Sequence, residues 1–146
     1  MQRRDMDDAQ RQAFIAQFEA GVTAGIVGFI VLGGVFAESV DLPGERLVGM
    51  VVVGVGLPPP SLERRALESS LAPLGRIAAY EQPAMTRVVQ AAGRIIRSAS
   101  DRGVLCLVDD RFLQPDYARY LPSHWQVTAL RADQVEAALY AFWNNR

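Results

Sequence analysis

The chain has 146 residues, and 50% of them are hydrophobic, which is enough for one domain with a core and too few for two ordinary domains. Its 15 basic and 16 acidic side chains give a net charge of -1, so the overall charge implies no attraction to nucleic acid or to an anionic membrane. Any contact with a polyanion must therefore be local.

Single copies of cysteine and histidine narrow the chemistry further. Cys106 alone excludes a disulfide, a cysteine-ligated iron–sulfur cluster and a cysteine zinc site within this chain, and we expect it to be a core residue in a reducing compartment. His124 alone gives little support to a histidine metal site or a Ser-His-Asp triad. The charged start, residues 1–8, is unlike a secretory signal, so we expect a cytoplasmic protein without a metal site.

The first 37 residues predict a helix and then a buried strand. Asp7 or Asp8 can cap a helix over residues 8–20, with its phenylalanines facing inward. Residues 20–37 contain 18 positions without a charge, which is near the lower limit for a membrane span. The run carries five glycines, and its β-branched side chains favour a strand over residues 26–32, covered on both faces, rather than a membrane helix.

Later apolar runs predict strands at residues 47–55 and 103–108, and a shorter strand at residues 126–129. The first two do not alternate with polar residues, which is typical of a parallel sheet covered by helices on both faces. Ligands of open α/β sheets bind at the carboxyl ends of strands. We therefore expect three loops to lie along one rim: residues 33–44, 56–60 and 109–111.

Helices are expected between these strands. Ser61 can cap a helix over residues 63–74, a linker is expected at residues 80–83, and a last helix is expected over residues 132–143. The order of strands and helices predicts an α/β fold with a parallel sheet.

The helix expected over residues 83–99 would separate an apolar face from a charged one. The apolar positions are Val88, Ala92, Ile95, Ile96 and Ala99, and the polar positions are Arg87, Gln90, Arg94 and Arg97. Planar guanidinium groups suit multidentate contact with phosphate oxygens, and Gly93 lets a ligand approach, which is the chemistry of an arginine finger. From this helix alone, a solvated face whose arginines pair with carboxylates is equally open.

Five ordered motifs resemble those of the second motor domain of XPD/DinG-type DNA helicases, a superfamily-two group, and the similarity extends over residues 9–143. Each motif is weak alone, and the order makes them specific. Ser39 stands where the family usually has glycine. The motifs are Phe36-Ala37-Glu38-Ser39-Val40-Asp41, Gln90 to Arg97, Asp101-Arg102-Gly103, Asp109-Asp110-Arg111-Phe112 and Leu121-Pro122-Ser123-His124-Trp125.

The resemblance implies a RecA-like α/β fold and a role for each motif. Gln90, Arg94 and Arg97 would reach the triphosphate bound on the first motor domain and stabilise charge during phosphoryl transfer. Nucleotide contacts or their support are implied for Asp41, Glu38 and Gly93. Structural support is implied for Asp101, Asp109 and Arg111, and we favour pairing between the last two. The candidates for single-stranded DNA, through backbone amides, are Gly33, Gly34 and Gly56.

The chain contains no Gly-x-x-x-x-Gly-Lys-Ser/Thr loop and no Asp-Glu-x-His box, which in this family lie on the first motor domain. We therefore expect residues 1–146 to be a single partial domain that lacks its first strand-helix unit, with ATP and Mg²⁺ bound mainly by the first motor domain of the same protein. Self-association of such a fragment is also expected, because missing elements would expose a strand edge.

Two other functions are alternatives to a helicase half that acts in DNA repair or replication. A RecA-like interaction or scaffold module would keep the fold, but it has no physical need for Gln90, Arg94 and Arg97 together. A Rossmann-type nucleotide enzyme is disfavoured because Gly33 and Gly34 open no Gly-x-Gly-x-x-Gly pattern before a helix.

Overall fold

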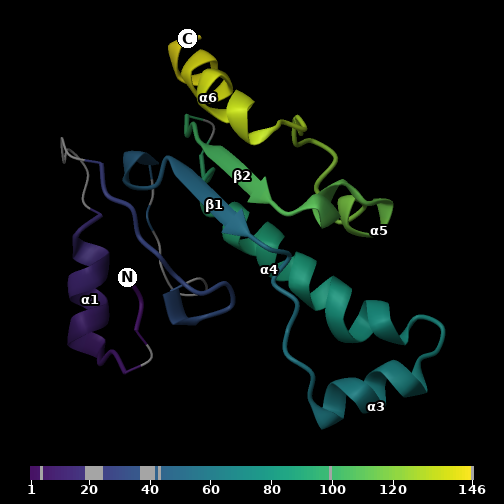
Figure 1. The fold of residues 1–146 in the computed structure, drawn as a ribbon. Coiled ribbons are helices and arrows are strands. Elements are labelled where there is room, and N and C mark those ends of the chain that lie inside the picture. Colours follow the sequence, from purple (N-terminus) through teal and green to yellow (C-terminus); the bar gives the residue numbers. More distant parts are fainter. Residues whose placement is uncertain (4, 19–24, 37–41, 43, 99, 146) are drawn as a thin grey trace.

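Two parallel strands and the helix between them form the centre of the molecule. The computed structural model describes residues 1–3, 5–18, 25–36, 42, 44–98 and 100–145. Within them, β1 (Gly49–Val53) pairs with β2 (Val104–Val108), with Gly49 opposite Val104 and Val53 opposite Val108. Figure 1 shows that both strands run in the same direction, with α4 behind them. The predicted parallel sheet is thus confirmed as a small α/β unit with flanking helices, which is a partial RecA-like fold.

The core lies on one face of this sheet. Met85 and Val88 of α4 (Gln82–Ala92) are fully buried and pack against Val52 of β1. The other face is open, because Val51 and Val53 are 64% and 80% exposed. The prediction that both faces of this strand are covered is therefore wrong for the described residues, which place the covering helix on one side only.

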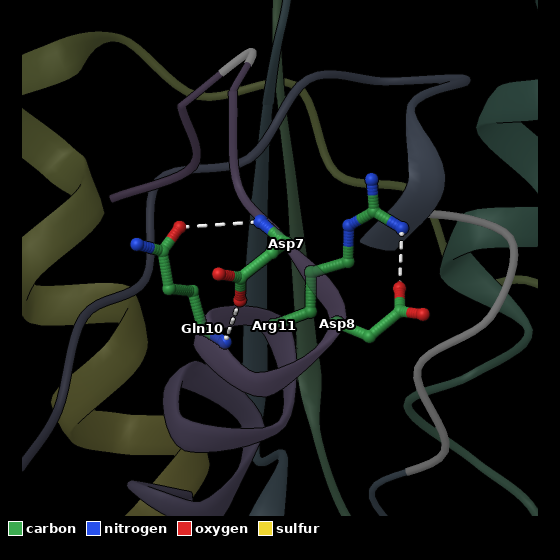
Figure 2. A network of polar contacts seen from close by, with 4 residues as sticks. All are labelled: Asp7, Asp8, Gln10 and Arg11. Carbon is green, nitrogen blue, oxygen red and sulfur yellow. Dashed lines mark hydrogen bonds and ion pairs between the residues drawn. The ribbon is translucent and has the colours of Figure 1, made fainter.

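The N-terminal helix α1 (Asp8–Ala16) begins where its cap predicts. The Asp7 carboxylate accepts a hydrogen bond from the Gln10 N–H at 2.8 Å, and the Gln10 side chain accepts one from the Asp7 N–H at 3.2 Å. Figure 2 shows this reciprocal cap beside the Asp8–Arg11 ion pair. Residues 17 and 18 follow in a turn, and the predicted helix end at residue 20 lies outside the described residues.

The predicted strand over residues 26–32 is not formed. This segment is extended, but among the described residues its hydrogen bonds to distant parts of the chain are made with Gln2. The Gln2 N–H donates to the Phe29 carbonyl at 2.8 Å, and the Gln2 side-chain oxygen accepts from the Val31 N–H at 2.9 Å. Phe29 is 67% exposed. A buried strand needs a neighbouring strand and a covered face, and the described elements provide neither.

The helical segment before the second strand differs from the prediction at both ends. Ser61 caps α3 (Leu62–Ser70) by accepting from the Arg64 N–H at 3.3 Å, as predicted. The expected linker at residues 80–83 is instead a π-helical turn, η2 (Ile77–Glu81), which continues into α4 with Pro83 in its first turn, where no N–H is needed. The helix then ends at Ala92, seven residues before the predicted end at residue 99.

The remaining elements are short. A 3-10 turn η1 (Gly44–Arg46) precedes β1, and η3 (Asp110–Leu113) and α5 (Pro115–Ala118) follow β2. The strand predicted over residues 126–129 is absent from the structure, where these residues are irregular and exposed. The predicted last helix is confirmed as η4 (Ala132–Gln134) followed by α6 (Val135–Asn144).

Arg102 ties α6 to the start of β2. Its guanidinium lies 4.4 Å from the centre of the Phe142 ring, and it donates hydrogen bonds to the carbonyls of Phe142 and Asn145. In the part of the chain that the structure describes, no helix is long and apolar enough to cross a membrane.

Candidate functional site: an arginine pocket at the end of α4

An open pocket of about 910 Å³ lies at the carboxyl end of α4. Five residues singled out from the sequence line it together: Gly33, Gln90, Gly93, Arg94 and Arg97. Arg87 and Ala91 complete the described lining, so three arginines line one cavity, and none of its described lining residues is a carboxylate. Such a surface suits a polyanion that carries several acceptor oxygens.

The arginines stand on a tight turn that follows α4, not on a continuous helix. The Gly93 N–H donates to the Val89 carbonyl at 2.9 Å, and the Arg94 N–H then donates to the Ala91 carbonyl at 3.1 Å, which is the shorter spacing of a 3-10 turn. Arg94 is half-buried, whereas Gln90 and Arg97 are exposed. The prediction that all polar positions share one helix face is therefore wrong beyond Ala92, yet the turn still carries them to the same pocket.

The turn is anchored by Ile95, which is buried against the start of β2. A Cβ atom on Gly103 would lie 2.1 Å from the Ile95 Cγ2 atom and 3.1 Å from the Val48 carbonyl oxygen. Only glycine therefore lets Ile95 pack this closely. This contact explains why a glycine follows the arginine turn in the sequence.

Asp101 holds the backbone at Arg97. Its carboxylate accepts hydrogen bonds from the N–H groups of Arg97 at 2.7 Å and Ser98 at 2.9 Å, and from the Ser98 hydroxyl at 2.8 Å. The hydrogen bond from the Arg97 backbone is the main cause that lowers the pKa of Asp101, followed by the bonds from Ser98. Asp101 thus fixes the backbone at Arg97 and Ser98, and the supporting role that the resemblance implies for it in a helicase stays a prediction.

Asp109 and Arg111 pair with one another at the end of β2. The Asp109 oxygens accept from Arg111 Nε at 2.9 Å and from Arg111 Nη2 at 2.7 Å, and one oxygen also accepts from the Arg111 N–H at 2.9 Å. These bonds, with the side-chain ones first, lower the pKa of Asp109 to about 2. The pair is a structural clamp, as favoured from the sequence.

Two of the glycines predicted to bind DNA adopt backbone conformations that require glycine. Gly33 has φ of +75° and Gly56 has φ of +65°. The Leu32 side chain lies against Gly56, so the ends of the two loops meet, as the predicted rim requires. The Gly34 N–H donates to the Val31 carbonyl at 2.9 Å. Glu38, Ser39 and Asp41 lie outside the described residues.

Arg87 lies on the charged helix face expected from the sequence, where no role was predicted for it. The signal was present, because Arg87, Gln90 and Arg94 follow one another at spacings of three and four residues. Sequence alone could not show that the loop at Gly33 returns to this face. No group of three or more His, Cys, Asp or Glu side chains that could hold a metal occurs among the described residues.

Comparison with known proteins relates the chain to one family. The model of the helicase C-terminal domain matches residues 1–128. A probable ATP-dependent helicase of Methanocaldococcus jannaschii is 32% identical over 120 residues, 73% of this chain and 18% of that protein. The ATP-dependent helicase DinG of Mycobacterium tuberculosis is 28% identical, covering 90% of this chain and 20% of that protein. The ATP-dependent DNA helicase chl-1 of Caenorhabditis elegans is 33% identical, covering 73% and 13%.

Proposed function

Because the chain belongs to the helicase C-terminal domain family, as a domain of the DinG/XPD type, we propose that it is the nucleotide-sensing half of an ATP-dependent DNA helicase. The observation that carries this proposal is the single pocket shared by Gln90, Gly93, Arg94 and Arg97. The chain spans no more than a fifth of the length of the relatives described above, so the remaining parts of the motor belong to the rest of such a protein.

The chemistry follows from the side chains present. Arg94 and Arg97 are suited to stabilise the negative charge that develops on phosphate oxygens during transfer, because their charge and donor geometry are fixed in advance. Gln90 can donate to a phosphate oxygen or orient the attacking water. None of the described residues that line the pocket is a carboxylate for Mg²⁺, and we propose that ATP and Mg²⁺ are held mainly by the first motor domain while this chain supplies the arginine finger.

The same proposal assigns the loops at the rim of the sheet to single-stranded DNA. Gly33, Gly34 and Gly56 lie on these loops and are the proposed contacts, because backbone amides bind phosphates without reading sequence. Binding there would have to displace the side chains of Arg87 and Leu32, which lie against Gly33 and Gly56. Asp41 and Glu38 keep their proposed places near the nucleotide. DNA repair or replication is the setting that we propose for the parent helicase.

Assays on the isolated chain are the first test of the proposal. A finger acts only after another site has positioned the triphosphate and Mg²⁺, so pure chain should show no DNA-stimulated ATP hydrolysis. Its binding to single-stranded DNA should be weak, with a Kd above about 10 μM at physiological salt, and should weaken steeply as salt rises. Measurable ATPase activity would contradict the proposal that another domain holds ATP and Mg²⁺. Tight, salt-insensitive DNA binding would contradict the proposed DNA surface.

A further inference from the structure

Arg87 is the third arginine of the pocket, beside the proposed finger residues Arg94 and Arg97. It lies in α4, one turn before Gln90, and its half-buried side chain reaches the cavity that Arg94 and Arg97 also line. No described residue forms a hydrogen bond or an ion pair with its guanidinium group. Its position is set instead by the loop at Gly33.

Gly33 and the Arg87 side chain fit together closely. A Cβ atom on Gly33 would lie 3.1 Å from Arg87 Cδ, 3.2 Å from Nε and 3.3 Å from Cζ, so the end of the arginine lies across the bare backbone of the glycine. The positive φ of +75° is a second, independent reason for glycine at this position. The Gly33 turn therefore restricts where the Arg87 guanidinium can lie.

The spacing of the arginines indicates the shape of the ligand. Arg87 and Arg94 are seven residues apart, about two turns of chain, of which the last part is the tight turn after Ala92. Guanidinium groups that lie side by side along this row can contact successive phosphates of one chain, whereas a single phosphate offers fewer acceptor oxygens to share among them. We propose that Arg87 is a third phosphate-contacting residue, held over the pocket by the Gly33 turn, and that it makes the pocket selective for the polyphosphate chain of a nucleotide. This inference rests on the proposed function.

Titration of the chain with inorganic tripolyphosphate tests the inference, with inorganic phosphate as the short ligand. Chemical shifts of ¹⁵N-labelled chain report weak binding and show at once whether a variant is folded. Arg87→Ala should lower the affinity for tripolyphosphate about tenfold and change the affinity for phosphate by less than about threefold. Arg87→Lys keeps the charge but loses the planar fork, so its affinity for tripolyphosphate should lie between those of the original chain and Arg87→Ala. Arg65→Ala, on the exposed surface of α3, is the matched control and should bind like the original chain.

The role of the Gly33 turn is tested by Gly33→Ala in chains with and without Arg87→Ala. If the turn positions the guanidinium, Gly33→Ala should weaken tripolyphosphate binding in the original chain and have little further effect once Arg87 is alanine. Equal losses in both backgrounds would overturn the positioning role.

Separate outcomes distinguish the inference from the function on which it rests. If Arg94→Ala and Arg97→Ala abolish tripolyphosphate binding while Arg87→Ala leaves it intact, the inference fails and the finger pocket stands. If none of the three arginines affects binding, or if the original chain shows no shifts with about 10 mM tripolyphosphate, the inference fails, and the turnover numbers of Arg94→Ala and Arg97→Ala in a complete helicase decide the finger separately. If Arg87→Ala weakens an oligothymidylate more than tripolyphosphate, the residue serves the DNA backbone and the nucleotide assignment is wrong.

Discussion

Gly93 and Gly33 line the same pocket, but their backbones need glycine to different degrees. Gly33 has a left-handed backbone and is covered by Arg87. Gly93 has φ of -60°, which any residue adopts, and a Cβ atom there would be 3.5 Å from the nearest atom, the Val89 carbonyl oxygen. The fold therefore does not require glycine at position 93. The proposed approach of a ligand to the end of α4 would give position 93 a separate reason for glycine.

Gly93→Ala separates these two requirements. The free energy of unfolding should be unchanged or higher by about 0.4–1 kcal/mol, because alanine restricts the unfolded chain and meets no clash in the folded one. Binding of tripolyphosphate should weaken severalfold, since the added methyl group projects into the pocket. Denaturant unfolding and the phosphate titration measure the two effects on the same sample. Unchanged binding would show that the ligand does not approach Gly93.

The Asp109–Arg111 clamp predicts how stability depends on pH. The pKa of Asp109 falls from 3.8 to about 2 on folding, so the clamp stabilises the fold fully above pH 4 and progressively less as the pH falls through about 2. Asp109→Asn should therefore cost about 1 kcal/mol near pH 7, since Arg111 is partly solvent-screened, and the difference from the original chain should shrink towards pH 3. Urea unfolding across this range measures it. Asp116→Asn, at an exposed carboxylate outside the described ion pairs, is the control, and a pH-independent difference for Asp109→Asn would count against the clamp.

Sequence patterns predicted those secondary-structure elements whose formation depends on nearby residues. The Asp7 and Ser61 caps mark the starts of α1 and α3, because each side chain satisfies an N–H within its own first turn. The apolar runs at β1 and β2 and the last helix were also located correctly. These features require no knowledge of the rest of the fold.

The failures all depend on partners that are distant in sequence. Residues 26–32 have the composition of a buried strand, yet a strand forms only where another strand offers its edge. The helix over residues 83–99 keeps its apolar period past Ala92, but packing of Ile95 on Gly103 and the bonds from Asp101 favour a turn there. For the same reason, the sequence could predict that the arginines and Gly93 belong to one site. It could not predict that Gly33 lies against Arg87.

At the scale of the whole molecule, one side of the described sheet carries exposed apolar side chains. Val51, Val53 and Val108 lie on the face opposite α4, and Val27 and Phe29 are exposed in the unpaired segment nearby in sequence. Apolar surface and an unpaired extended segment both favour association with a similar surface.

We predict that the purified chain self-associates. Sedimentation velocity over a concentration series should show dimers or larger species well before about 100 μM. Val53→Asp places a charge on the open face and should shift the chain towards monomer, whereas Leu62→Asp, at an equally exposed position on α3, should not. A monomer throughout the series would mean that the open face does not drive association.

The central claim is that the arginine pocket acts on a nucleotide that another domain holds. The most direct measurement is the DNA-stimulated ATPase turnover number of a complete helicase that contains this domain, with Arg94→Ala, Arg97→Ala and the control Arg65→Ala compared at saturating ATP. Each pocket substitution should lower the turnover number by about 10³-fold or more and change nucleotide affinity much less, because a finger acts in the transition state. Near-normal turnover in both pocket variants would contradict the account and return these arginines to a structural role.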